Sequence, residues 1–274
     1  MKNMNIKKRF LESSLYKVFT IIKKNLNAYF STIILDLIFL GLIFSVGKYV
    51  GSLIPTDPQQ LMNLFKTQAT LLLFVFGYPL LYYLFVILLY SIVKLTILNI
   101  INSSYENDKF SLKRFGKFYL LNILIFIIFL SIGLIIFGIS AITLTRVFLS
   151  YFVLILSVPF LFFFYSTISI SHTLFIKKEE KGIIKKSFKI AFNKINKYGM
   201  FIVWDAIFAF VYLLFYNLIH LIFRIFVFSN QELLVSYGSL YLKIFNIISL
   251  IVIYKILAFN RIYFYGRIDN NVLQ

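Results

Sequence analysis

The chain contains no cysteine and is poor in proline, histidine, tryptophan and acidic residues. Its 274 residues include 4 Pro, 2 His, 1 Trp and 10 Asp and Glu together. Without cysteine the chain has no disulfide, thiolate metal ligand or cysteine nucleophile. The two histidines, His172 and His220, have no acid beside them in the sequence. This excludes the His-Glu-x-x-His cluster of a metalloprotease.

Other catalytic patterns are also missing. No cluster of arginine, histidine and acid indicates a lipid phosphatase. Ser169 and Ser171 are expected to form hydrogen bonds within their helix, because no partnered base that would make either a nucleophile can be identified. The chain contains no P-loop and no glycine-rich dinucleotide turn. We therefore expect no enzymatic activity, no cofactor and no metal.

Apolar runs dominate what is present. Hydrophobic residues make up 61% of the chain, with a mean hydropathy of +0.89, and several runs reach the roughly 20 residues that cross a bilayer. The pattern predicts an all-α integral membrane protein, with six transmembrane helices in one membrane domain over residues 1–274. The expected spans are about 30–50, 69–93, 118–139, 147–170, 198–223 and 242–259. A short connection at 140–146 predicts an antiparallel hairpin, and a mixed loop is expected at 230–239.

Charge is distributed unevenly between the spans. The formal net charge is +18, but the basic residues lie in the gaps between spans rather than on a separate hydrophilic domain, so nucleic acid is not an expected partner. Alternate gaps hold 23 and 5 of the 28 Lys and Arg residues. The positive-inside rule then predicts that both termini are cytoplasmic. We expect a multi-pass protein of the cytoplasmic (plasma) membrane of a prokaryote.

Two basic segments are predicted to form amphipathic helices on the cytoplasmic membrane surface. From Lys181 to Tyr198 apolar residues recur at spacings of three and four opposite a lysine-rich face, and residues 1–29 show a similar pattern. Anionic lipid is the expected partner, with a soluble protein as the alternative. The expected headgroup contacts are Lys181, Lys185, Lys186, Lys189, Lys194 and Lys197. Lys94, at the end of the second span, is also expected to reach the headgroups.

A threefold repeat organises the spans in pairs. An aromatic residue (Tyr29, Phe115 or Tyr198) precedes a polar residue by seven positions at the start of each odd-numbered span. The three polar residues are Asp36, Asn122 and Asp205. The proposed units are residues 1–101, 102–176 and 177–274, each with a basic segment and two spans. The alternative is a chance match in a chain with 53 Phe and Tyr.

The same three residues form the candidate intramembrane polar site. A carboxylate in mid-membrane costs about 2.5 to 3.5 kcal/mol on insertion scales, so we expect Asp36 and Asp205 to face each other or a shared polar cavity. One interpretation is hydrogen bonding between helices or hydration near the interface. The other is a proton- or cation-binding pair, with Asn122 as the third member of a ring.

A short motif resembles a known group of membrane families. Ser187 and Phe188 lie in the basic segment, and Asn196 with an aromatic residue leads into the fifth span. This pattern is similar to uncharacterised six-span families related to the membrane domain of glycerophosphodiester phosphodiesterases. The resemblance implies a membrane-domain-like protein of unknown activity, without the phosphodiesterase, which in that family is a separate soluble domain. Mitochondrial carriers are excluded, because Pro55 and Pro58 lack their surrounding signature.

Two functions are therefore consistent with the sequence. The first is a non-catalytic structural, assembly or membrane-organising component, which the lack of catalytic patterns favours. The alternative is a small-solute or ion transporter that uses Asp36 and Asp205.

The charge distribution makes a direct prediction about topology. Single cysteines, introduced into a chain that has none, report which side of the membrane each position occupies. An impermeant thiol reagent applied to intact cells should label positions 56, 141 and 231 and should leave 104, 178 and 274 unlabelled. Labelling of Lys178→Cys from outside would contradict the predicted orientation.

Overall fold

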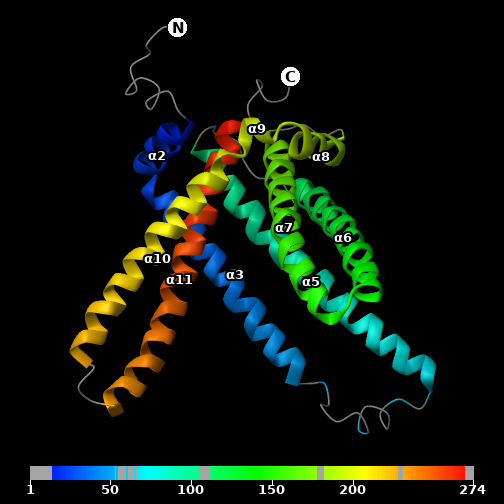
Figure 1. Ribbon diagram of the computed structural model, residues 1–274. Coiled ribbons are helices and arrows are strands. Elements are labelled where there is room, and N and C mark those ends of the chain that lie inside the picture. Colours follow the sequence, from blue (N-terminus) through cyan, green and yellow to red (C-terminus); the bar gives the residue numbers. More distant parts are fainter. Residues whose placement is uncertain are drawn as a thin grey trace. The chain divides into compact units, whose positions relative to one another are not determined.

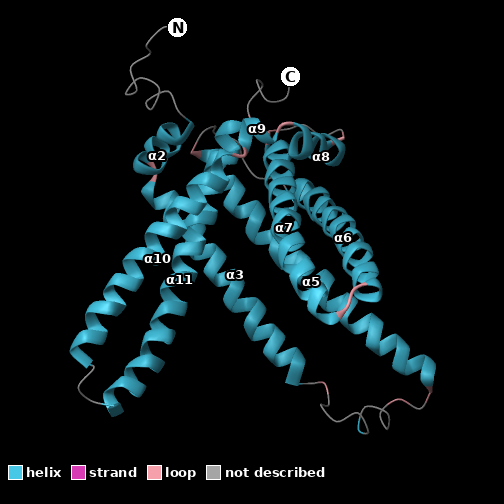
Figure 2. Ribbon diagram, viewed as in Figure 1, coloured by secondary structure: helices cyan, strands magenta, loops and turns pink. Residues whose placement is uncertain are grey.

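The computed structural model describes residues 14–52, 54, 60, 65, 67–104, 112–177, 182–227 and 231–268, and helices account for all regular secondary structure in these ranges (Figures 1 and 2). Six helices are long and apolar enough to cross a membrane. They are α3 (Leu26–Ser52), α5 (Gln68–Ser103), α6 (Leu112–Thr143), α7 (Arg146–Ile176), α10 (Met200–Val227) and α11 (Gln231–Arg267). The all-α, six-span membrane fold is thus confirmed, and the protein is a polytopic membrane protein.

Within the described ranges three shorter helices accompany the six spans, and the chain divides into two compact units. The short helices are α2 (Ser14–Lys24), α8 (Ile183–Asn193) and α9 (Ile195–Tyr198). The central unit comprises residues 27–192, which include nearly all of α3, all of α5, α6 and α7, and most of α8. The terminal unit comprises residues 1–26 and 193–274, with α2, α9, α10 and α11. Each unit is described separately below.

Aromatic side chains hold the helices of the central unit together. The ring of Phe126 on α6 lies 5.6 Å from Tyr90 of α5 and 5.4 Å from Phe164 of α7, measured between centroids. The Tyr119 hydroxyl of α6 donates a 3.2 Å hydrogen bond to the Leu84 carbonyl of α5. Edge-to-face ring pairs of this kind stabilise contacts beyond simple burial. Helices α5, α6 and α7 therefore form one packed group (Figure 1).

The long helices of the central unit have two zones. The end of a long helix that adjoins a basic segment of the sequence is called its basic end below. On α6 the residues from Phe118 to Phe129 include a buried stripe. On α7 every residue from Ser166 to Ile176 is buried. Large apolar residues of α7 from 148 to 161 are exposed instead. Helix α5 is about 54 Å long, against a hydrocarbon core of about 30 Å, so the surplus at the basic end is available for packing between helices.

The terminal unit is a hairpin of α10 and α11 with two short helices packed at its basic end. Phe19 of α2 contacts Phe259 of α11 with ring centroids 5.3 Å apart, and Tyr198 of α9 is fully buried against Phe264. Further along the hairpin, the Tyr216 hydroxyl donates to the Tyr241 carbonyl at 3.1 Å. These contacts link α10 to α11 along their length.

Three expectations about element bounds are wrong. The mixed loop expected at 230–239 is helical from Gln231, because the hairpin turns within fewer residues and α11 begins earlier. The single basic helix expected from 181 to 198 is two helices, α8 and α9, separated at Lys194, whose backbone leaves the helical region (φ −120°, ψ 28°). Nearly all of α8 belongs to the central unit, and α9 belongs to the terminal unit. The long helices also extend past the apolar runs at their basic ends, because hydropathy marks the membrane crossing and not the helix end.

The two zones make a prediction about stability. Ile125 on α6 is fully buried, whereas Leu134 on the same helix is 66% exposed. Ile125→Ala should lower the free energy of unfolding by about 2 to 5 kcal/mol because it leaves a cavity, while Leu134→Ala should change it by less than about 1 kcal/mol. Denaturant titration of the detergent-solubilised protein, followed by circular dichroism, measures both. Equal losses would contradict the division into zones.

Candidate functional site

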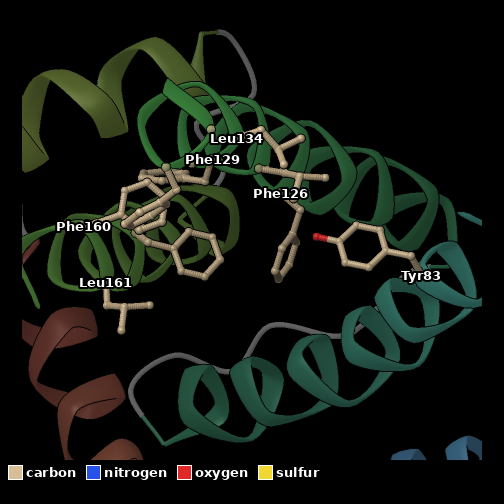
Figure 3. Close-up of a pocket in the computed structure, with 11 residues that line it drawn as sticks. Tyr83, Phe126, Phe129, Leu134, Phe160 and Leu161 are labelled. Atoms are coloured by element: carbon tan, nitrogen blue, oxygen red, sulfur yellow. The ribbon is translucent and has the colours of Figure 1, made fainter. Parts of the chain in front are cut away.

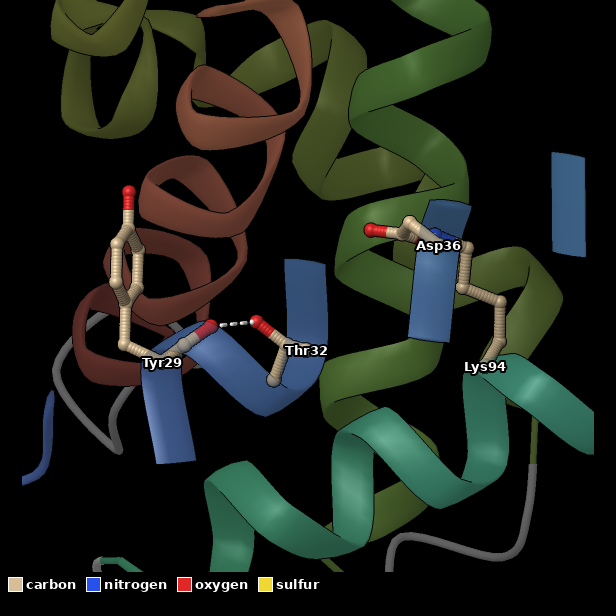
Figure 4. A network of polar contacts seen from close by, with 4 residues as sticks. All are labelled: Tyr29, Thr32, Asp36 and Lys94. Carbon is tan, nitrogen blue, oxygen red and sulfur yellow. Dashed lines mark hydrogen bonds and ion pairs between the residues drawn. The ribbon is translucent and has the colours of Figure 1, made fainter. Parts of the chain in front are cut away.

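An ion pair joins the first two spans. Asp36 of α3 and Lys94 of α5 point toward each other, with Lys94 Nζ 3.1 Å from Asp36 Oδ1 (Figure 4). Their side chains are 2% and 13% exposed. The Lys94 ammonium also lies 5.5 Å from the centroid of the Tyr90 ring, close enough for a cation–π attraction. Because charges buried away from water are costly unless paired, this contact is what allows both residues inside the membrane protein.

Local sequence explains why α3 and α5 meet at this point. Only Thr32, Ile33 and Asp36 of α3 are buried, and they form one stripe at helical spacing. The Thr32 hydroxyl donates to the Tyr29 carbonyl of its own helix at 2.7 Å (Figure 4), so it is satisfied without a partner on α5. Asp36 is therefore the residue of the stripe that supplies a polar contact to another helix.

A second polar chain lies one turn away on α5. Asn122 of α6 donates from Nδ2 to Ser91 Oγ at 2.9 Å, and its Oδ1 lies 2.8 Å from His172 Nε2 of α7. Ser91 and Asn122 are fully buried and His172 is 5% exposed. Since the amide oxygen can only accept, His172 carries its proton on Nε2 and donates to Asn122. Three helices are thus joined by two hydrogen bonds.

The direction of this chain limits its chemistry. The Ser91 hydroxyl donates to the Ile87 carbonyl at 2.7 Å. The donation runs from His172 through Asn122 and Ser91 to a backbone oxygen, which has no proton to pass on. The arrangement suits a fixed link between helices better than a proton relay.

The terminal unit contains a third pair. Asn260 of α11 donates from Nδ2 to Asp205 Oδ2 of α10 at 2.7 Å. Asp205 Oδ1 and Asn260 Oδ1 are both buried and accept no hydrogen bond from the residues that the structure describes. The indole N–H of Trp204 is likewise buried without an acceptor among these residues. This pair is thus less completely satisfied than the chain on Asn122.

The three predicted polar residues share a common arrangement. Asp36, Asn122 and Asp205 each contact a polar residue on the next span, namely Lys94, His172 and Asn260. Asp36 and Asn122 both contact the same segment of α5, through Lys94 and Ser91. Asp205 belongs to the other unit, so the predicted ring of all three and the predicted pairing of the two acids stay predictions. The threefold repeat remains a hypothesis that this common arrangement supports.

The predicted headgroup lysines are distributed over both units. Lys185, Lys186 and Lys189 on α8 are exposed, while Ile183, Ser187, Ile190 and Ala191 of the same helix are buried. Lys197 is exposed and Lys194 is half-buried in the terminal unit. Lys181 lies outside the described residues. Lipid contact by these lysines remains a prediction.

Sequence reasoning missed the partners of the three polar residues. Lys94 was expected at the headgroups, but it pairs with Asp36, because α5 continues for nine residues beyond it. The depth of Lys94 in its helix could have indicated this pairing, because Lys94 lies nine residues from the end of α5 and Asp36 lies ten residues from the start of α3. Ser91, His172 and Asn260 gave no such signal, because isolated Ser, His and Asn residues are common at span ends.

Comparison with known proteins gives no match: no family model, no curated protein and no solved structure is similar to this chain. The site's chemistry must therefore be inferred from its own residues.

The Asp36–Lys94 pair makes a prediction about stability. Lys94→Met should lower the free energy of unfolding by about 3 kcal/mol or more, because it leaves the Asp36 carboxylate buried without its partner. The double variant Asp36→Leu, Lys94→Met should recover most of that loss, since neither charge remains. Lys48→Met, an exposed position on α3, is the matched control and should have little effect. Additive effects of the two substitutions in a double-mutant cycle would show that the pair is not coupled.

Proposed function

We propose that this protein is a non-catalytic membrane-organising component that gathers anionic lipid on the cytoplasmic side of a prokaryotic plasma membrane. The observation that carries the proposal is that Asp36, Asn122 and Asp205 each pair with a polar residue within their own hairpin. Side chains used in this way hold helices together and are not free to bind a solute. What the protein presents outward is apolar side chains and lysines.

The exposed groups match the chemistry of a lipid surface. Helix α8 buries Ile183, Ile190 and Ala191 and exposes three lysines, and α2 exposes Lys23 and Lys24. Each lysine near an anionic surface contributes on the order of 1 kcal/mol, decreasing over a Debye length. The other basic residues on the same side of the spans, apart from Lys94, add to this attraction. This supports placing both termini and the basic helices at the cytoplasmic leaflet.

Lipid gathering can be measured with the whole protein. Proteoliposomes of phosphatidylcholine with a small fraction of phosphatidylglycerol, the latter labelled with a self-quenching fluorophore, should lose fluorescence when the protein is present. The loss should weaken as salt rises, because exposed charges are screened. Labelled phosphatidylcholine is the control and should show no change. Equal quenching of both lipids would reject the proposal.

A transporter is the second candidate, because of two particular observations. Asp36 and Lys94 are ionisable side chains inside a membrane protein, which commonly mark ion pathways. Asp205 Oδ1 and Asn260 Oδ1 are buried acceptors that no donor in the described part of the chain satisfies, and a proton or small cation would need such acceptors.

Flux measurements separate the two candidates. Under the organising function, proteoliposomes with an imposed pH gradient or membrane potential should leak protons and alkali cations no faster than empty liposomes. Under the transport function, flux should be present in the wild type and fall in Asp36→Asn and Asp205→Asn variants that keep the wild-type circular dichroism spectrum. Those substitutions remove the charge but keep most hydrogen-bonding capacity.

A further inference from the structure

An apolar cavity lies between α5, α6 and α7 in the lipid-facing zone of the central unit. Its volume is about 470 Å³, within the range of ligand sites. Figure 3 shows Tyr83 directing its hydroxyl toward Phe126 on one side, with Phe129, Phe160 and Leu161 on the other. The remaining lining residues are Leu130, Gly133, Leu134, Phe137, Gly138 and Phe164. Apart from the Tyr83 hydroxyl, every lining side chain is apolar.

The dimensions of the cavity suit one hydrocarbon chain. Its lining follows α6 from Phe126 to Gly138, a rise of about 18 Å. Half of a hydrocarbon core of about 30 Å is one leaflet, so the cavity is as long as a single leaflet is deep. Leu134 and Leu161 are more than half exposed, which leaves the cavity open to the surrounding lipid. A lipid chain can therefore enter from the side.

Helix α8 borders one end of this cavity. The ring of Phe188 on α8 stacks on Phe129, a lining residue, with centroids 5.5 Å apart and planes 15° apart. Phe192 of α8 stacks on Phe163 of α7 at 4.4 Å. Lys185 and Lys189, which flank Phe188 on α8, are exposed. The exposed positive charge is thus on a helix that contacts a residue lining the apolar cavity.

We propose that the cavity binds one acyl chain of an anionic phospholipid whose headgroup phosphate contacts Lys185 and Lys189. The charge of the lysines selects an anionic headgroup, and the cavity selects a hydrocarbon chain directly beneath it. Helix α8 contacts α6 at Phe129, which is the last residue of the buried stripe of α6 and is followed by the exposed Leu130. This is the position expected for α8 if it lies at the boundary between headgroups and hydrocarbon. The site rests on the proposed lipid-organising function and deepens it by naming one specific lipid position.

Two pairs of variants separate the chain site from the headgroup site. A Cβ at Gly138 meets no atom within 4 Å, so Gly138→Leu adds a side chain to open space in the cavity. Gly41→Leu, on the exposed face of α3 and also without a neighbour within 4 Å, is its control. Lys185→Gln with Lys189→Gln removes two charges at α8, and Lys48→Gln with Lys243→Gln removes two exposed charges outside the basic segments as the matched control.

Native mass spectrometry of the full chain, exchanged with equal phosphatidylglycerol and phosphatidylcholine, provides the readout. The wild type should retain one phosphatidylglycerol after other lipids are stripped. Gly138→Leu should lose it, and the α8 lysine pair should lower the preference for phosphatidylglycerol by about fivefold per lysine. Both control variants should behave as the wild type. Retention by Gly138→Leu, or an equal loss in the controls, would overturn the site.

A second measurement covers the case in which Gly138→Leu fails to fold. Leu161→Trp in a Trp204→Phe background places the sole tryptophan at the cavity. Phosphatidylglycerol with brominated acyl chains should quench it more strongly than brominated phosphatidylcholine at the same fraction. Equal quenching by the two brominated lipids would overturn the proposal. The absence of quenching by either lipid would also overturn it, because it would show that a second copy or a partner helix covers the cavity. If the protein gathers no bulk phosphatidylglycerol but the tryptophan is still quenched more strongly by brominated phosphatidylglycerol, the organising function is rejected and the site is kept. If the protein gathers phosphatidylglycerol but the two brominated lipids quench equally, only the site is rejected.

Discussion

The structure depends on one constraint, namely that a polar side chain inside a bilayer protein must find a partner. The protein satisfies it with contacts between consecutive spans: Asp36 with Lys94, Asn122 with His172, and Asp205 with Asn260. Each contact lies toward the basic ends of its helices. Lys94, His172 and Asn260 lie just past the expected membrane crossings, in helix ends where burial between helices replaces exposure to lipid. The polar pairs and the packed zone therefore coincide.

The three pairs differ in how completely they satisfy their members. The Asn122 chain ends on a backbone carbonyl and uses the donors of all three side chains in sequence. The Asp36–Lys94 pair neutralises two charges, and the Tyr90 ring supports the lysine. The Asp205–Asn260 pair leaves two acceptor oxygens without a protein donor. If one of the three pairs exchanges a proton or a cation, we expect it to be the Asp205–Asn260 pair, because its two remaining acceptor oxygens can bind the ion.

Packing between helices relies on aromatic rings rather than on small residues. Phe126 contacts rings on α5 and α7, and Phe129 contacts rings on α7 and α8. Large rigid rings leave spaces between helices where they do not interdigitate, and the cavity beneath α8 is such a space. In the sequence, the many Phe residues indicate only that the chain is apolar. In the folded protein, their packing produces a cavity with a defined shape.

The sequence by itself determined the class of protein, the six spans and the three polar residues of the first helix of each hairpin. Hydropathy over about 20 residues is a local property, and an acid inside an apolar run is visible without a structure. The sequence did not determine where helices end, because α5 and α11 continue through polar residues that hydropathy assigns to loops. Nor did it determine the partners Lys94, His172 and Asn260, which lie 50 to 58 residues away from the residues they contact. Such pairs depend on helix rotation and on the packing of rings such as Tyr90 and Phe118, which only the tertiary structure fixes.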